Sequence, residues 1–429
     1  MPIATPPGYR ALAEDEVGGY LAGVPAIAAR LGGSPDRWRV REVGDGNLNL
    51  VFLVEGATGA VCVKQALPYV RVAGEGWPMP LERAFFEYRA SIIQAPRVPG
   101  LVPEMLHYDE QLFLMVMERL APHIIMRKGM IAATVYPRFA AHIAEYLAQT
   151  LFASSDLAVP AAAKKAQVAL FCANTELCKI TEDLIFTDPY MVHVRNRWTS
   201  PQLDAAAAAI RDDGALKRAV SLLKLKFLTE AQALLHGDLH TGSIMVTADD
   251  TRVIDPEFAF YGPIGFDVGK LLGNLVMSFF SQDGHETRPG ARDAYREWVL
   301  ATIEAVWDGF AQRFVALWNG PRDGEAFPMA LFAGPAGEAS LRLAQEAFLR
   351  ALLTDALGYA GTAMIRRTLG FAHNADFETI ADPERRAVCE RLNLELAREL
   401  ILGAAAISGW TEVTARAREL RARGPRFPG

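Results

Sequence analysis

Two short segments in the middle of the chain constrain the fold more strongly than any other feature of the sequence. The first reads His-Gly-Asp-Leu-His-Thr-Gly-Ser over residues 236–243, and the second reads Val-Ile-Asp-Pro-Glu-Phe over residues 253–258. Short β-like runs on either side of a turn at 248–250 predict a hairpin between them. Because the strands of a hairpin are antiparallel, Asp238 at its entrance is expected near Asp255 and Glu257 at its exit.

Three carboxylates gathered in this way suit phosphoryl transfer. One accepts the proton of an attacking hydroxyl, and the others hold Mg²⁺ against the phosphates of a nucleotide. Asp255 and Glu257 are separated by one residue, so in an extended chain both side chains point to the same side and can reach one cation. We therefore predict Asp238 as the catalytic carboxylate and Asp255 and Glu257 as the metal ligands.

The order of these residues matches the protein-kinase pattern His-Arg-Asp-Leu-x-x-x-Asn followed by Asp-Phe-Gly. Gly237 replaces the arginine, Ser243 stands at the asparagine position, and Asp-Pro-Glu begins 17 residues after Asp238. The alternative is structural: the aspartates cap turns and His236 is a hydrogen-bonded core histidine. That alternative is favoured for any one residue taken alone, whereas the ordered set favours the catalytic interpretation.

The chain changes character near residue 120. Before it, the pattern predicts five strands and one helix, at 38–43, 50–55, 60–65, 81–94 (the helix), 101–108 and 112–117. After it, the pattern predicts helices, the clearest at 136–153, 216–228, 336–368 and 383–406. We expect an α+β, bilobal, protein-kinase-like fold, with a small β-rich N-lobe over 1–120 and a large, mostly helical C-lobe over 121–429. Such an arrangement places a ligand cleft between the lobes.

The N-lobe carries an independent signal for nucleotide binding. Residues 44–51 read Gly-Asp-Gly-Asn-Leu-Asn-Leu-Val, which departs from the kinase pattern Gly-x-Gly-x-x-Gly-x-Val only at Asn49. Asparagine tolerates a left-handed backbone, so the tight turn can survive. The loop residues predicted to bind ATP are Gly44, Asp45, Gly46, Asn47 and Asn49.

A lysine and a glutamate extend this nucleotide site. The strand at 60–64 ends in Lys64, the position of the lysine that pairs with phosphates in kinases. Glu87 in the following helix is the expected ion-pair partner, and Glu82 is the competing one. Met-Val-Met-Glu-Arg-Leu over 115–120 falls where a hinge is expected, so backbone groups of Glu118 and Leu120 are predicted to bond the adenine edge. The alternative for this segment is an ordinary strand end between the lobes.

Composition limits the remaining function classes. The 44 basic and 50 acidic residues give a net charge of −6, which argues against a general nucleic-acid binder. No apolar run approaches the ~18 residues needed to span a membrane, and the first 20 residues lack the apolar segment of a signal peptide. The four cysteines are too scattered for a disulfide framework or a zinc site and are expected to be reduced core thiols of a cytoplasmic protein. They are Cys62, Cys172, Cys178 and Cys389.

With these motifs in place, the chain resembles the aminoglycoside phosphotransferase and choline kinase group of small-molecule kinases, which share His-Gly-Asp-Leu-His. More narrowly, it is similar to the 5-methylthioribose kinases of methionine salvage, which carry Ser243 and the run Asp-Pro-Glu-Phe-Ala-Phe-Tyr-Gly-Pro at 255–263. The matching stretches lie between about residues 40 and 375. They are 44–51, 63–65, 74–78, 117–118, 186–189, 236–243, 255–269 and 364–367.

The resemblance implies transfer of the ATP γ-phosphate to the 1-hydroxyl of 5-methylthioribose, with Mg²⁺ as cofactor and a homodimeric assembly. It assigns Asp238, Asn47 and the arginine pair Arg366 and Arg367 to the sugar site, and it places a loop around Trp77 over the substrate or nucleotide. Guanidinium groups there would donate to sugar hydroxyls and repel a polycationic aminoglycoside. The structural alternatives are a charged helix end for the arginines and a packed loop anchor for Trp77. His373 is more readily explained as structural than as a sugar contact.

Two other functions stay open at this point. One is a kinase of another small alcohol, such as choline, homoserine or an aminoglycoside. The other is a catalytically silent nucleotide-binding scaffold, which is disfavoured because Lys64, Asp238 and Asp255 are all present.

Overall fold

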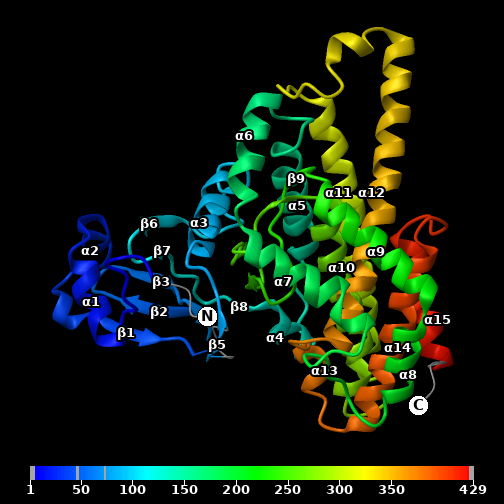
Figure 1. Ribbon diagram of the computed structural model, residues 1–429, viewed down its shortest axis with the longest axis horizontal. Helices are drawn as coiled ribbons and strands as arrows, with labels where there is room; N and C mark the ends of the chain where they lie inside the picture. Colours follow the sequence, from blue (N-terminus) through cyan, green and yellow to red (C-terminus); the bar gives the residue numbers. More distant parts are fainter. Residues whose placement is uncertain (1–4, 45–47, 72–73, 425–429) are drawn as a thin grey trace.

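The N-terminal part of the chain contains a five-stranded antiparallel sheet in the order β1-β2-β3-β7-β6 (Figure 1). The computed structural model describes residues 5–44, 48–71 and 74–424. The strands are β1 (Arg39–Glu42), β2 (Asn49–Glu55), β3 (Ala60–Ala66), β6 (Met105–Asp109) and β7 (Leu114–Glu118). All five strands predicted from the sequence are present, with ends that differ by no more than four residues.

The two faces of β3 explain how a lysine fits at the end of an apolar strand. Val61 and Val63 are fully buried in the cluster formed with α1 (Glu14–Ala22) and α2 (Pro25–Leu31), two helices that the sequence analysis did not predict. Because side chains alternate along a strand, Lys64 points to the opposite face. There it meets α3 (Arg83–Gln94), the predicted N-lobe helix.

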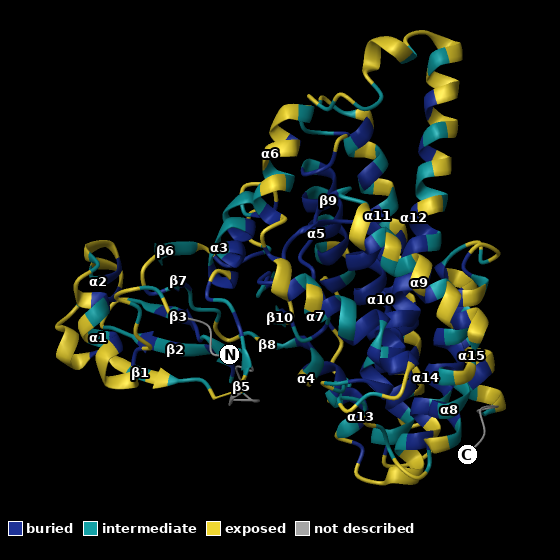
Figure 2. Cartoon of the chain, in the orientation of Figure 1, coloured by how far each residue is buried: buried dark blue, intermediate teal, exposed yellow. Residues whose placement is uncertain are grey.

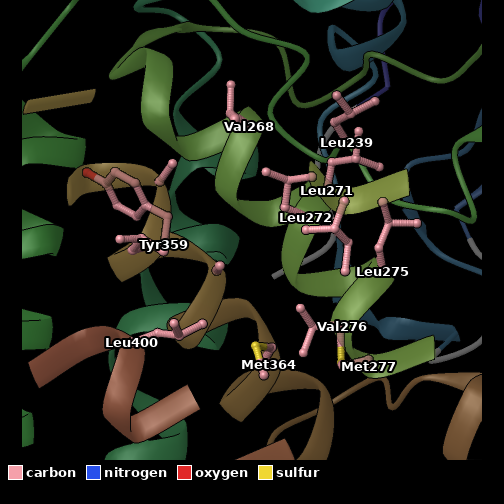
Figure 3. Packing of buried hydrophobic residues seen from close by; sticks show 14 of the residues in the cluster. Leu239, Val268, Leu271, Leu272, Leu275, Val276, Met277, Tyr359, Met364 and Leu400 are labelled. Atoms are coloured by element: carbon pink, nitrogen blue, oxygen red, sulfur yellow. The ribbon is translucent and has the colours of Figure 1, made fainter. Parts of the chain in front are cut away.

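The rest of the chain is mostly helical and is built around α10 (Ile264–His285), as the dark ribbon in Figure 2 shows. Every residue of α10 from Ile264 to Gln282 is buried, which is expected of a helix enclosed on all sides. It packs against α12 (Pro335–Leu369), α14 (Pro383–Gly403) and α11 (Asp293–Asn319). Figure 3 shows Leu239, from the loop at 236–243, in the same core as the leucines of α10.

The other elements complete this helical part and connect it to the sheet. They are α4 (Met126–Ile131), α5 (Phe139–Ala153), α6 (Ala161–Phe171), α7 (Thr175–Phe186), α8 (Asp204–Asp212), α9 (Gly214–Thr229), α13 (Ala375–Glu378) and α15 (Trp410–Arg423). Short 3₁₀ turns occur at Pro35–Arg37, Asp188–Tyr190 and Met329–Phe332. A small ribbon, β4 (Tyr69–Val70) with β5 (Gly74–Pro78), follows β3 and was not predicted.

Two nested strand pairings hold the two constraining segments together. The predicted hairpin is confirmed as β10 (Ile244–Val246) and β11 (Thr251–Val253), with Ile244 opposite Val253. Outside it, β9 (Ala233–Leu234) pairs with β12 (Tyr261–Gly262). The loop at 236–243 and the segment at 253–258 therefore lie between two sets of backbone hydrogen bonds and are fixed relative to each other. A third short strand, β8 (Ile124–Ile125), joins β10.

The expected α+β architecture, with a small sheet-containing part and a large helical part, is confirmed (Figure 1). The division at residue 120 stays a prediction. Within the described ranges, no helix is both long and apolar enough to cross a membrane. The four cysteines are free, but Cys172 is exposed, so its assignment as a core thiol was wrong.

Candidate active site

Lys64 at the end of β3 belongs to a buried cluster of ion pairs. Its Nζ donates to both carboxylate oxygens of Glu87, at 2.8 and 2.7 Å, and also pairs with Asp255. Glu82, the competing partner, is exposed. Burial alone would lower the pKa of Lys64, but the carboxylates of Asp255, Glu87 and Glu257 raise it above its ordinary value. Lys64 is therefore a protonated ammonium at the floor of the site.

Glu257 is held beside this cluster by polar groups of the N-terminal part. Asn49 Nδ2 donates to Glu257 Oε2 at 3.0 Å, and Nε of the fully buried Arg83 lies 3.5 Å from the same oxygen. Arg83 also donates to Asn49 Oδ1 at 3.1 Å. Burial raises the pKa of Glu257, and the neighbouring Asp255 adds to the rise. Asn49, which was predicted in the nucleotide loop, thus links the first residues of β2 to a predicted metal ligand.

Carboxylate oxygens of Glu87, Asp255 and Glu257 lie within 4.8 Å of one another. Asp255 is the accessible member, with a side chain that is 45% exposed, whereas Glu87 and Glu257 are buried. Its backbone has a φ of 71°, a left-handed conformation that costs a non-glycine residue about 1–2 kcal/mol. Strain of this kind is typical of functional sites. The all-oxygen donor set has the chemistry that a hard divalent cation requires.

The loop at 236–243 is fixed by hydrogen bonds from both sides. Asp267 of α10 accepts the backbone N–H of His236 at 2.6 Å and that of Gly237 at 3.1 Å. His236 Nδ1 accepts the N–H of Asp238 at 3.2 Å, so its Nε2 carries the proton and donates to the Ile254 carbonyl at 2.9 Å. His236 is therefore a bridge between the two constraining segments.

Gly237 and Ser243 explain why this loop departs from the protein-kinase pattern. Gly237 has a φ of 79°, and a Cβ there would lie 2.1 Å from the Phe258 carbonyl, so an arginine does not fit. Ser243 Oγ donates toward the Asp238 carbonyl at 3.0 Å and accepts the His240 N–H at 2.9 Å. The serine thus closes the loop on itself.

Asp238 lies among cationic and hydrogen-bonding groups. Lys270 Nζ pairs with its Oδ1, and His240 Nε2 faces its Oδ2 at 3.3 Å. His240 Nδ1 accepts the Gly242 N–H at 2.8 Å, which leaves the proton on Nε2. Burial lowers the pKa of His240 to about 3, so this imidazole is neutral. Burial alone would raise the pKa of Asp238, but Lys270 and then His240 hold it well below its ordinary value.

Arg366 and Arg367 lie near Asp238 at the end of α12. Both donate to the Ala372 carbonyl, at 3.4 and 2.9 Å. Among the described residues, neither guanidinium has a carboxylate within ion-pair distance, and Arg366 Nε has no hydrogen-bond partner. Burial lowers the pKa of Arg366 to about 10, an effect that the charge of Asp238 opposes. Burial and the adjacent Arg366 also lower the pKa of Arg367. A pair of crowded cations with unused donors is suited to an oxygen-rich or anionic ligand.

Trp77 of β5 reaches across to the helical part. Its ring centre lies 5.5 Å from that of Phe371, and the guanidinium of Arg195 sits over it at 5.6 Å. Arg195 Nε is in turn 2.8 Å from Asp188 in the predicted Phe-Thr-Asp-Pro stretch. Phe371 directly precedes Ala372, whose carbonyl holds the arginine pair, so Trp77 packs against the segment that positions Arg366 and Arg367.

The remaining predicted residues make none of the contacts with Lys64, the acidic cluster or Asp238 described above. Glu118 ends β7, and its N–H donates to the Glu104 carbonyl at 2.9 Å. Leu120 follows in the connection to β8. Gly44 is exposed after β1, and Asp45, Gly46 and Asn47 lie outside the described residues. His373 Nε2 bonds the Arg197 carbonyl at 2.6 Å, which agrees with its expected structural role.

Sequence relatives decide the family of this chain. The phosphotransferase enzyme family matches residues 39–310. Methylthioribose kinase 1 of Oryza sativa subsp. japonica is 49% identical over 401 residues, which cover 92% of each chain. The methylthioribose kinase of Escherichia coli O45:K1 (strain S88 / ExPEC) is 46% identical over 406 residues, which cover 94% of this chain and 96% of that protein. The chain belongs to the methylthioribose kinase family.

A solved structure, a glucosamine kinase (crystal form B), aligns with a TM-score of 0.46 and 12% identity, over 92% of this chain and 86% of its own. The assignment to the methylthioribose kinase family rests on the sequence relatives instead.

The structure adds four residues to the site of this methylthioribose kinase family member that the sequence analysis did not assign. They are His240, which lies within the quoted motif, and Arg83, Asp267 and Lys270. Each left a signal. Arg83 precedes Glu87 by four residues, so both lie on one face of α3. Asp267 and Lys270 are the two charged residues in the mostly apolar run 264–282, where burial is costly unless each charge has a partner.

Proposed function

We propose that this chain transfers the γ-phosphate of ATP to the 1-hydroxyl of 5-methylthioribose, giving 5-methylthioribose 1-phosphate and ADP. The observation that carries the proposal is the 46–49% identity to methylthioribose kinases over nearly the whole chain. The geometry supports it, because Lys64, the acidic cluster and the loop of Asp238 lie on segments that are hydrogen-bonded together. ATP would lie under the loop at 44–51, with Gly44, Asp45, Gly46, Asn47 and Asn49 near its phosphates and Glu118 and Leu120 at its base.

Asp238 acts on the acceptor hydroxyl. Because its pKa is held low, the carboxylate is ionised at neutral pH and accepts a hydrogen bond from the sugar. The anomeric hydroxyl of a ribose is more acidic than an ordinary alcohol. Asp238 therefore orients this hydroxyl for attack more than it removes the proton in advance.

A divalent cation fits the carboxylate set, and we propose Mg²⁺ held by Asp255 and Glu257. Their oxygens converge with those of Glu87, while Glu87 is already bonded to Lys64. When bound, the cation would neutralise charge on the β- and γ-phosphates. Lys64 would contribute a further positive charge to the same phosphates. A cytoplasmic homodimer, expected from the sequence, stays a prediction.

The acceptor is tested by a coupled ADP-release assay across a panel of alcohols. We expect ADP release that depends on 5-methylthioribose and little or none with choline, homoserine or kanamycin. The two arginines would repel the cationic compounds, because both guanidinium groups lie near Asp238. Turnover of choline or kanamycin in place of methylthioribose would show that the chain is a kinase of another small alcohol.

Arg366→Ala is expected to raise the KM for methylthioribose by about 10- to 100-fold, because it removes charge-assisted donors to the sugar. The KM for ATP should change little. Both constants are measured in the same assay, with Arg197→Ala, an exposed arginine paired with Glu378, as the matched control. Equal damage to both substrates would contradict a sugar-site role for Arg366.

A further inference from the structure

Lys270 contacts the catalytic loop but has no part in the function proposed above. Its side chain comes from the first turns of α10, and the residue is only 4% exposed. The ammonium pairs with Asp238 Oδ1, donates to the Gly237 carbonyl at 3.3 Å, and lies 5.2 Å from the centre of the Phe266 ring. Burying a lysine is costly, so these contacts need an explanation.

Lys270 and Asp267 contact different groups of the loop at 236–243. They are three residues apart on α10 and lie on the same face of that helix. Asp267 accepts the backbone N–H groups of His236 and Gly237, whereas Lys270 binds the next carbonyl and then the side chain of Asp238. Both the backbone of the loop and the Asp238 carboxylate are thus held by side chains of α10, a helix that is buried over its first 19 residues.

Lys270 also differs from the other groups that face Asp238. These are Arg127 from α4, Arg366 and Arg367 from α12, and His240 from the loop itself. Of the basic side chains in the described part of the chain, only those of Lys270 and His240 have a nitrogen within 4 Å of the Asp238 carboxylate, and His240 is neutral. Lys270 is therefore the one full positive charge in that group that touches Asp238 directly.

We propose that Lys270 is a positioning residue for phosphoryl transfer, whose ammonium keeps the Asp238 carboxylate ionised and in one orientation toward the acceptor hydroxyl. This inference rests on the proposed function of Asp238 and deepens it. A carboxylate has more acceptor sites than Lys270 and His240 occupy, so the acceptor hydroxyl can bond Asp238 without displacing either group.

The test compares Lys270→Met with Lys164→Met. Lys164 is a matched control, because it is 3% exposed, pairs with Asp156, bonds the carbonyls of Ala231 and Gln232, and lies 5.3 Å from the centre of an aromatic ring. Both variants lose a buried ammonium. We expect Lys270→Met to lower kcat by at least about 10-fold, with the KM for ATP within about twofold of wild type. Lys164→Met should keep the wild-type kcat.

The pH profile separates positioning from structural support. In Lys270→Met, the pKa of Asp238 loses the charge that lowers it most strongly against the effect of burial. The acid limb of kcat against pH should therefore move to higher pH by about one unit or more. Lys270→Arg keeps the charge and should lose less activity than Lys270→Met. An unchanged kcat and acid limb in Lys270→Met, or equal losses of kcat in both methionine variants, would overturn the proposal.

A readout independent of turnover distinguishes this proposal from the proposed function. In protein labelled at the aspartate carboxyl carbons, the Asp238 signal is identified by its loss in Asp238→Asn and titrated by ¹³C NMR. Lys270→Met should raise the pKa of Asp238, and Lys164→Met should not. Absence of methylthioribose-dependent ADP release from the wild type would refute the proposed function alone, whereas an unshifted Asp238 titration in Lys270→Met would refute the role of Lys270.

Discussion

Asp238→Asn is expected to lower kcat for phosphoryl transfer by about 10³-fold, the scale on which a positioned acid or base group contributes to catalysis. The amide is nearly the same size as the carboxylate but is neutral and cannot accept a proton. ATP should still bind with nearly wild-type affinity, since Lys64 and the acidic cluster are reached from other segments. Single-turnover phosphorylation of methylthioribose and calorimetric titration with an unreactive ATP analogue measure the two quantities separately.

Asp249→Asn is the matched control for this substitution. Asp249 lies in the turn of the β10–β11 hairpin, and its side chain is 83% exposed. This variant should show wild-type turnover. Near-wild-type activity of Asp238→Asn would remove Asp238 from the catalytic centre and return the loop to the structural alternative.

Lys64→Met is expected to affect stability and function together. It leaves Glu87 fully buried without its cation, and breaking a buried pair from one side typically costs about 3–5 kcal/mol of unfolding free energy. Burial raises the pKa of Glu87 and the charge of Lys64 opposes that rise, so removing the lysine should raise the pKa of Glu87 further. Urea denaturation followed by circular dichroism measures the loss of stability, and the same protein should bind ATP weakly.

A second variant separates the two effects. Lys64→Met combined with Glu87→Leu removes both charges, and replacing a buried pair by apolar side chains is often close to neutral. Stability should therefore recover in large part while ATP binding and turnover remain low. Lys179→Met, which breaks the partly exposed pair with Asp183, should cost less than about 1 kcal/mol. If Lys64→Met were as stable as Lys179→Met, the Lys64–Glu87 pair would not contribute as we describe.

The parts of the fold that sequence predicted are those in which local pattern and tertiary environment agree. Apolar side chains alternate over the middle of β2 and the first half of β3, where one face is buried, and the hairpin has a clear turn between apolar runs. The helices α1 and α2 were missed because they are short, because α1 has two glycines in its middle and because α2 begins with a proline. Their formation depends on packing against the sheet that they cover. Tertiary packing, rather than local preference, determines them.

The site divides in the same way. Lys64, Asp238 and Asp255 belong to motifs with a fixed order and spacing, so the ordered set, rather than any one residue taken alone, led to their prediction. The contacts of Asn49 and Arg83 with Glu257 cross about 170–210 residues of sequence, and no spacing rule encodes them. Lys270 was missed for a related reason. A charged residue in a buried helix indicates that a partner must be present, but the sequence does not show which residue that partner is.

The placement of β8 has a mechanical consequence. Glu118 ends the last strand of the N-terminal sheet in chain order, and Ile124 begins the strand that is bonded to the hairpin after the loop at 236–243. Arg119 is tied back to Glu55 of β2, and His123 is tied forward to Asp250 in the hairpin turn. Residues 120–122 lie between Arg119, which is paired with the N-terminal sheet, and His123, which is paired with the hairpin. Along this covalent connection, only three residues lie between the two ties, whereas the pairs of Lys64 with Asp255 and of Asn49 with Glu257 link the N-terminal sheet to the segment at 253–258 independently of it.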